Sequence, residues 1–243
     1  MPSPGRSDAM PDIKILSAGA AQAVVEKNTE SYTREIGHNV TADFSAVGAM
    51  KARVVGGEAV DVIILTGALI DELIASGHVV AGSRSDLGKV GTGVAVRAGT
   101  DVPDVSSAQA LRGSLLAASR IVCPDPATAT AGKVVVGVLE RLGIGAQVKP
   151  RMQHFPNGYA AMEWLGNSRG SREIGITQIT EILANKGVTY AGPLPGDLQT
   201  KTIYSAGLSA GAAEPAAGRE FIARLAAPTA RSVLEQAGYE FDD

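Results

Sequence analysis

The sequence predicts an α/β protein built from two lobes of mainly parallel sheet, flanked by helices and joined by hinge strands. Short apolar runs alternate with helical patterns along most of the 243 residues, and this alternation is typical of βαβ units. Two strand-like segments, 91–99 and 201–211, interrupt the alternation. They suggest that the chain crosses to a second lobe and later returns. We therefore expect one lobe at 11–90 plus 200–243 and the other at 91–199.

Six segments combine an apolar strand, a few small or hydroxyl residues and a helix. Their strand parts begin at Ile13, Asn39, Val60, Arg120, Gln147 and Glu173, and their helix parts follow at Ala21, Ala49, Ala68, Lys133, Tyr159 and Ile179. The third helix has Gly77 as its C-terminal stop. A single doubly wound sheet of the Rossmann type is the alternative, but none of these strands is followed by the glycine spacing that a dinucleotide needs.

Three further helices complete the pattern. One lies at 107–119, after a loop rich in Pro, Asp and Ser, and the last two begin at Pro215 and Pro228. Proline suits a first helical turn, because its missing N–H would have no partner within the helix there.

Composition excludes several classes of function. The formal net charge is −3 and no basic run occurs, so nucleic-acid binding has no electrostatic basis. The single cysteine, Cys123, lies at the end of an apolar run and is interpreted as a core residue. The three histidines, His38, His78 and His154, lie far apart and lack metal-ligand spacing. We therefore expect neither a metal site nor a cofactor.

The N-terminal residues bear on localisation. Residues 1–12 are polar and contain prolines, without the apolar stretch of a signal peptide. No segment of the chain is long and apolar enough to insert into a membrane. As it stands, the sequence predicts a cytoplasmic protein; if a signal has been removed, it predicts a periplasmic one. An ABC permease is an expected partner only in the second case.

The residues at the predicted strand ends suggest an anion site. In parallel sheets, ligands bind at the carboxyl ends of the strands, and helix N-termini that meet there offer N–H groups to an anion. The alternative is that each serine or threonine is only an N-cap. The candidate ligand-binding residues are Ser17, Ala18, Ser45, Ala46, Thr66, Thr130, Ala131, Asn157, Gly158 and Gln178.

Catalytic candidates are few. His154, Tyr159 and, with a lowered pKa, Lys89 are side chains near the expected cleft that can move a proton. The segment GLSAG around Ser209 fits a nucleophile-elbow pattern, but no histidine follows it. We therefore expect no nucleophilic catalytic set.

Three segments resemble the type II periplasmic solute-binding proteins, in particular their molybdate-binding branch. They are FSAVGAMKARVVGGEAVDVIILTGALIDELIASG from Phe44, DPATATAGKVVVGVLERLG from Asp125 and GREFIARLAAPTARSVLEQAGYEF from Gly218. Their order and spacing are similar to those of the family, and the resemblance extends from Ile13 to Phe241. It implies a two-lobed protein that closes over a small anion held without charged side chains.

The resemblance also implies which residues hold the ligand. It places hydroxyl donors at Ser17 and Ser45, and backbone donors near Ala131 and Gly158. Gln178 stands where the molybdate site has a tyrosine, and AVGAM replaces a serine-rich run. These departures favour a small organic acid over molybdate. An aconitate isomerase resembles the same branch, so the alternative is a cytoplasmic isomerase or lyase of a small polycarboxylate. A ligand-sensing module is a third interpretation.

Overall fold

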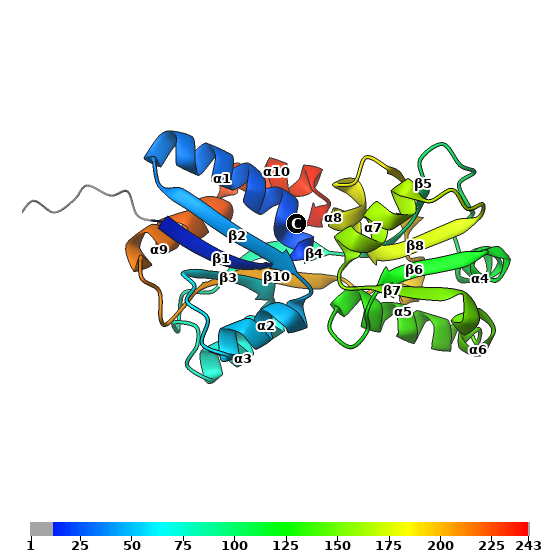
Figure 1. Ribbon diagram of the computed structural model, residues 1–243, viewed down its shortest axis with the longest axis horizontal. Coiled ribbons are helices and arrows are strands. Elements are labelled where there is room, and N and C mark those ends of the chain that lie inside the picture. Colours follow the sequence, from blue (N-terminus) through cyan, green and yellow to red (C-terminus); the bar gives the residue numbers. More distant parts are fainter. Residues whose placement is uncertain (1–11, 243) are drawn as a thin grey trace, which may run out of the picture.

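Two α/β lobes lie side by side in the computed structural model, which describes residues 12–242 (Figure 1). The two ends of the chain form one lobe, and the middle of the chain forms the other. This arrangement confirms the predicted fold class. Of the segment from which localisation was predicted, residues 1–11 lie outside the described residues.

The first lobe is built on a six-stranded sheet with the order β11-β4-β10-β3-β1-β2. Its strands are β1 (Asp12–Ala18), β2 (Asn39–Ser45), β3 (Val62–Thr66), β4 (Ser85–Val90), β10 (Thr202–Leu208) and β11 (Tyr239–Glu240). All five residues of β3 are buried. A continuous apolar run of this kind is typical of a strand that is covered on both faces.

Helices cover both faces of this sheet. They are α1 (Gln22–Ile36), α2 (Val47–Val55), α3 (Gly67–Ala75), α9 (Pro215–Leu225) and α10 (Arg231–Gln236), with 3₁₀ turns η1 (Gly19–Ala21) and η4 (Pro228–Ala230). Figure 1 shows α1 and α10 on one side of the sheet and α2 and α3 on the other. Gly77, with φ of +77°, follows α3 as the predicted stop.

The second lobe has a five-stranded sheet with the order β7-β6-β8-β5-β9. Its strands are β5 (Thr92–Arg97), β6 (Arg120–Pro124), β7 (Met152–Phe155), β8 (Glu173–Gln178) and β9 (Val188–Pro193). Its helices are α4 (Ala108–Ala117), α5 (Thr130–Arg141), α6 (Gly145–Val148), α7 (Gly158–Asn167) and α8 (Ile179–Leu183), with 3₁₀ turns η2 (Lys149–Arg151) and η3 (Gly196–Leu198).

Cys123 belongs to the core of the second lobe, as predicted. Its side chain is buried in β6 among aliphatic residues. Burial raises the pKa of this thiol to about 12, with a smaller contribution from the nearby Asp125 charge. The thiol is therefore protonated at neutral pH and unreactive.

Both sheets are mixed, with fewer parallel pairs than the sequence suggested. The strand-to-helix units give the parallel pairs β1–β2, β1–β3, β6–β7 and β6–β8. The strands that follow the two crossings, β5 and β10, run antiparallel to both of their neighbours. A chain that crosses to another lobe enters the new sheet from the lobe junction, so its direction is reversed.

Some elements differ from the sequence-based expectation. The strands β4, β9 and β11 were not expected, because their apolar residues do not alternate regularly. Residues 147–151, expected to begin a strand, belong to α6 and η2 instead. The helix expected from Pro228 begins as the short turn η4 and becomes α-helical at Arg231.

Hydrogen bonds hold together the two crossings between the lobes. The side-chain amide of Gln199, between β9 and β10, donates to the Thr92 carbonyl oxygen at 2.8 Å and accepts from the Thr92 N–H at 2.9 Å. The Ile179 N–H donates to the Gly91 carbonyl oxygen at 2.9 Å. The crossing strands are thus fastened to each other and to the start of α8, in the manner of a hinge.

The two lobes also touch at α2. The Gly48 N–H of α2 donates to the Thr128 carbonyl oxygen at 3.0 Å. A Cβ atom at Gly48 would lie 2.9 Å from that oxygen, so only glycine allows such a close approach. The structure therefore represents a closed arrangement of the lobes.

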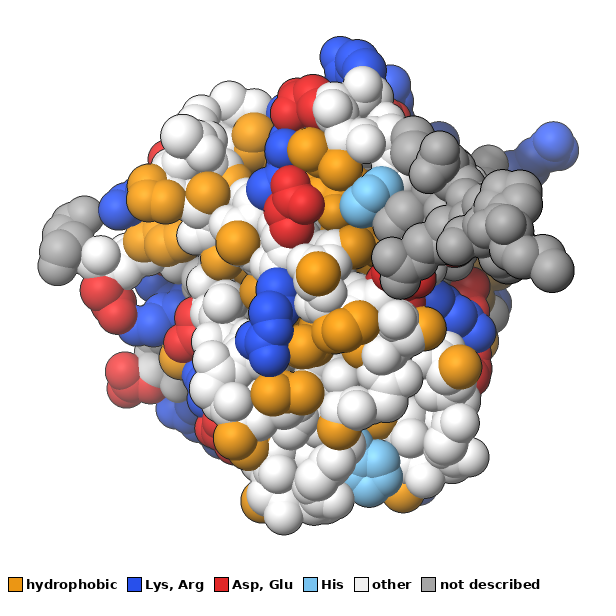
Figure 2. Space-filling view, turned by 90° about the vertical axis from the view of Figure 1, so that its left-hand side faces the viewer, with side chains coloured by type: hydrophobic (Ala, Val, Ile, Leu, Met, Phe, Trp, Pro, Cys, Tyr) orange, Lys and Arg blue, Asp and Glu red, His pale blue; other side chains and the backbone are white. Residues whose placement is uncertain are grey.

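The surface of the first lobe has a mixed character. Figure 2 shows its outer face with basic, acidic and hydrophobic side chains interspersed rather than gathered by type. Among the described residues, no helix is long and apolar enough to cross a membrane.

Candidate ligand-binding site

A small cavity lies where the closed lobes meet. It is lined from the first lobe by Ala18, Gly19, Ala20, Ser45, Ala46, Val47 and Tyr204, and from the second by Pro124, Ala129, Thr130, Ala131, Asn157, Gly158, Gln178 and Glu181. Its volume is ≈ 20 Å³, room for one small polar group.

The turn from β1 into η1 forms one wall through its backbone. Ala18, Gly19 and Ala20 line the cavity, whereas Ser17 does not. The Ser17 side chain is fully buried and its hydroxyl donates to the Ala18 carbonyl oxygen at 3.1 Å. Ser17 is not an N-cap either, because Ala18 holds that position without a side-chain bond. The small residues after Ser17 bring the backbone itself to the cavity.

The turn from β2 into α2 adds Ser45, Ala46 and Val47 to the same wall. Ser45 ends β2 beside Ala18 of β1, and Ala46 is the N-cap of α2 without a side-chain bond. Thr66, predicted from the same pattern, lies elsewhere. Its hydroxyl caps α3 by accepting from the Leu69 N–H at 3.4 Å, so Thr66 is an N-cap and does not line the cavity.

Two helix starts of the second lobe face the first lobe across the cavity. Thr130 and Ala131 open α5, and Gly158 opens α7. Asn157 is the N-cap of α7, and its side-chain oxygen accepts from the Ala160 N–H at 2.9 Å. All four residues line the cavity. The structure thus brings together eight of the ten predicted residues and leaves out Ser17 and Thr66.

Gln178 presents an unused amide to the cavity. The residue ends β8, is 2% exposed, and neither its Nε2 nor its Oε1 has a hydrogen-bond partner. The amide is close enough to lower the pKa of the Tyr204 phenol, yet it makes no hydrogen bond of ordinary geometry to it. A buried amide without partners is costly, and a ligand in the cavity would satisfy it.

Glu181 is a functional candidate that the sequence reasoning missed. It is the third residue of α8, the position from which a glutamate reaches back towards the N-cap N–H. Its carboxyl accepts from the Thr177 hydroxyl at 2.5 Å. The residue is 5% exposed and lines the cavity, so this capping glutamate is buried between the lobes instead of facing water.

Burial raises the pKa of the Glu181 carboxyl to about 7. The Thr177 hydroxyl and the N–H groups of Gln178 and Gly158 lower the pKa, and burial outweighs them. The carboxyl in turn raises the pKa of Tyr159 and Tyr204, for both of which burial is the larger cause. This carboxyl therefore changes protonation near neutral pH.

The three predicted catalytic side chains lie outside the cavity wall. Lys89 of β4 pairs with Asp242 at 2.6 Å, which directs its ammonium towards the C-terminus. His154 is exposed on β7, an edge strand of the second lobe. Tyr159 follows Gly158 and lies near Glu181. Of the three, Tyr159 alone stands beside the site.

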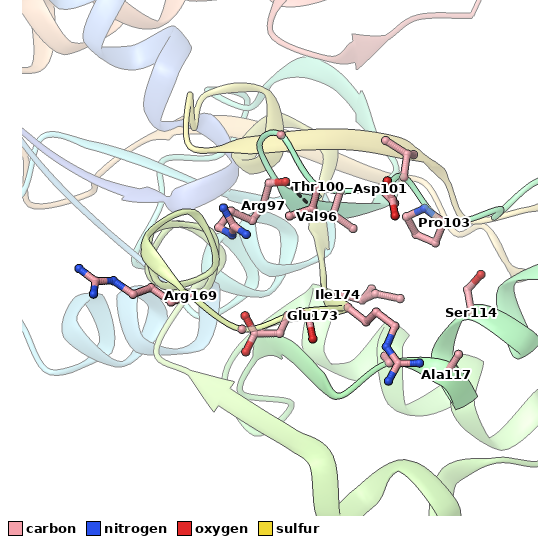
Figure 3. Close-up of a pocket in the computed structure, with 16 residues that line it drawn as sticks. Val96, Arg97, Thr100, Asp101, Pro103, Ser114, Ala117, Arg169, Glu173 and Ile174 are labelled. Atoms are coloured by element: carbon pink, nitrogen blue, oxygen red, sulfur yellow. Dashed lines mark hydrogen bonds between the residues drawn. The ribbon is translucent and has the colours of Figure 1, made fainter.

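A larger hollow of ≈ 580 Å³ lies in the second lobe, between β5 and the loop before β8. Three arginines border it, Arg97, Arg169 and Arg172. Figure 3 shows the Arg169 side chain extending away from the other labelled residues. Glu173, also in its wall, is held by Ser168 and lies 3.7 Å from Arg120. Because these side chains do not converge, we favour the smaller cavity between the lobes as the ligand site.

Comparison with known proteins identifies the family. A model described as bacterial extracellular solute-binding protein matches residues 13–240. An aconitate isomerase from Pseudomonas sp is 27% identical over 233 residues, which cover 93% of this chain and 86% of that protein.

Solved structures of low sequence identity share the fold. The periplasmic molybdate-binding protein of Azotobacter vinelandii has a TM-score of 0.78 at 20% identity, over 95% of this chain and 100% of that one. The sulfate-binding protein of Mycobacterium tuberculosis H37Rv has a TM-score of 0.71 at 16% identity, over 96% of this chain and 88% of that one. The resemblance seen in the sequence is thereby confirmed. Because the family model spans nearly the entire chain, the protein belongs to the bacterial extracellular solute-binding proteins.

Proposed function

We propose that this protein binds a small anion in the cavity between its lobes and closes around it by hinge motion. The observation that carries the proposal is the convergence of the starts of α2, α5 and α7 on one cavity. Among the described residues that line it, none is lysine, arginine or histidine. First-turn N–H groups have no partner within their helix and bind anions. The molybdate- and sulfate-binding proteins of the same fold support this proposal.

We propose further that the ligand is an organic acid rather than molybdate. A fully ionised tetraoxoanion offers only acceptor oxygens, and an ionised Glu181 also only accepts. An organic acid with a hydroxyl or a protonated carboxyl offers a donor to Glu181, while Gln178 offers both a donor and an acceptor. The cavity has room for about one water molecule, so the lobes must close less tightly around any of these anions than they do in this structure.

A thermal-shift screen tests both statements. A ligand that binds the native state raises the melting temperature by mass action. The screen includes molybdate, tungstate and sulfate as well as di- and tricarboxylates. All of them are added as salts of the same cation at equal ionic strength. Stabilisation by carboxylates above that by molybdate supports the organic-acid proposal. The reverse order would restore molybdate, and no stabilisation by any anion would remove the anion proposal itself.

Isomerisation of an unsaturated polycarboxylate is a second candidate function. The aconitate isomerase relative favours it, and Glu181 supplies what the predicted catalytic residues do not. A carboxyl with a pKa near 7 suits proton transfer at neutral pH. Such a reaction moves one proton from the methylene carbon to the far end of the double bond, through the carboxyl. Incubation with cis- and trans-aconitate, followed by NMR of the olefinic protons, tests it in the wild type and in Glu181→Gln.

The proposed binding function also bears on the cellular location of the protein. We propose that the protein works outside the cytoplasm with an ABC permease, in keeping with the extracellular family description. A cytoplasmic sensor or enzyme remains the alternative. Fractionation of cells that produce the full-length protein from its own gene distinguishes the two, because only an exported receptor appears in the periplasmic fraction.

A further inference from the structure

Glu181 places an acidic group in the wall of the proposed anion site. Its Oε1 faces Gly19 of the first lobe, where a Cβ atom would lie 2.7 Å away. Its Oε2 faces Gly158, where a Cβ atom would lie 1.8 Å away. Closure of the lobes thus encloses the carboxyl between two glycines, one from each lobe, at the edge of the cavity. Any anion in the closed site lies beside this carboxyl.

Within residues 12–242, no cationic side chain contributes to the pKa of Glu181. The groups that face it from neighbouring elements are the phenols of Tyr159 in α7, Tyr204 in β10 and Tyr239 in β11. The other titratable residues on the elements packed against α8 are Glu26, Lys27, Glu30, Tyr32, Arg34 and Glu35 of α1, Arg97 of β5, Glu163 of α7, Glu173 of β8 and Tyr190 of β9. None of them contributes to the pKa of Glu181. An ionised carboxylate and an anion would therefore repel each other without compensation in a site that excludes water.

A protonated Glu181 reverses this interaction. The neutral carboxyl has one O–H donor and keeps acceptor capacity for the N–H groups behind it. Its O–H then joins the Gln178 amide and the helix N–H groups as a donor to the ligand. Protonation consequently removes a repulsion and adds a hydrogen bond at the same time.

We propose that Glu181 is a specificity-determining residue through which an anion enters the closed site together with one proton. The proton comes from solution, or from the ligand if the ligand carries one, and resides on the Glu181 carboxyl in the closed complex. This inference rests on the proposed anion site and adds to it a dependence on pH. Anions without a proton bind less tightly as the pH rises.

Calorimetry in paired buffers tests the proposal directly. Full-length protein is titrated with molybdate and with trans-aconitate at pH 7.5, in two buffers of similar pKa and different ionisation enthalpy. Neither probe has a hydroxyl group, so an added proton must come from solution. We expect uptake approaching one proton per bound anion. Between pH 6.5 and pH 8.0 the affinity should fall up to about tenfold per pH unit.

Two variants separate Glu181 from other titrating groups. In Glu181→Gln, which keeps a neutral side chain of the same size, the uptake and the pH dependence should both disappear. Glu163→Gln removes an exposed carboxylate from α7 of the same lobe and should behave as the wild type. Anion binding without proton uptake in the wild type, or unchanged uptake in Glu181→Gln, would overturn this proposal alone. A wild type that binds neither these anions nor any in the screen would overturn the anion site, and this proposal with it.

Discussion

Gly158 and Glu181 are fitted to each other at the junction of the two lobes. A Cβ atom at Gly158 would lie 1.8 Å from Oε2 of Glu181 and 2.2 Å from the Thr177 hydroxyl oxygen. The first residue of α7 must therefore be glycine for the carboxyl to be buried where it is. The first residue of α7 and the capping Glu181 of α8 thus pack directly against each other.

Replacing Gly158 by alanine tests this fit. The added methyl group should push the Glu181 side chain out of its place and lower the free energy of unfolding by about 1–3 kcal/mol. Chemical denaturation measures the change. Gly137→Ala in α5 is the matched control, because a Cβ atom there meets nothing within 4 Å and alanine favours a helix by about 1 kcal/mol. Equal effects of the two changes would contradict the fit.

Gln178 should show opposite effects on stability and on binding. Its amide is buried without partners, so Gln178→Met removes an unsatisfied group and should raise the free energy of unfolding by about 1 kcal/mol. The same change removes a ligand contact and should weaken anion binding at least about tenfold. Denaturation and calorimetry on one protein sample measure both quantities. Weaker binding with lower stability would instead indicate a structural role.

Replacing the two predicted serines, Ser17 and Ser45, should have different effects on anion binding. Ser45 lines the cavity, whereas the Ser17 hydroxyl is used by the Ala18 carbonyl oxygen. Ser45→Ala should therefore weaken anion binding about tenfold, the value of a hydrogen bond to a charged partner. Ser17→Ala serves as the control and should bind normally. Titration of both variants with the anion chosen by the screen decides, and a loss confined to Ser17→Ala would contradict this placement of the site.

The stability of the closed, ligand-free protein should depend on pH through Glu181. The pKa of its carboxyl is about 7 in the folded protein, above the ordinary value of 4.5. The stabilising contribution is therefore fully present below pH 4.5 and is lost as the pH rises to about 7. The loss amounts to about 3 kcal/mol. In denaturation experiments, the free energy of unfolding of the wild type should fall relative to that of Glu181→Gln between pH 4.5 and about pH 7, and the difference should be constant outside this range.

The sequence predicted the fold because strand and helix patterns alternate along the chain. It also pointed to residues of the second lobe that line the cavity, since Ala131, Gly158 and Gln178 lie at or after strand ends whose position a local pattern determines. Ser17 does not line the cavity, because the chain reaches it through the backbone of residues 18–20, for which a hydroxyl pattern gives no signal. In that segment, the small size of the residues, above all the missing side chain of Gly19, is the feature that lets the lobes approach.

Glu181 and Tyr204 could not be placed from local patterns. A glutamate in a first helical turn is ordinarily an exposed cap, and its burial here depends on the other lobe closing over it. Tyr204 enters the site from β10, which joins the first lobe only after the chain has built the second. One signal in the sequence was available for Glu181, namely its position three residues after Gln178, at a strand end already assigned to the site.

Above all, we infer that the closed lobes hold one small anion between them. Calorimetric titration of the wild-type protein with trans-aconitate, molybdate and sulfate at pH 6.5 tests it most directly. We predict saturable binding of at least one of these anions, with one anion per protein molecule. An absence of measurable heat and of thermal stabilisation with all three anions, in protein shown to be folded, would contradict the claim.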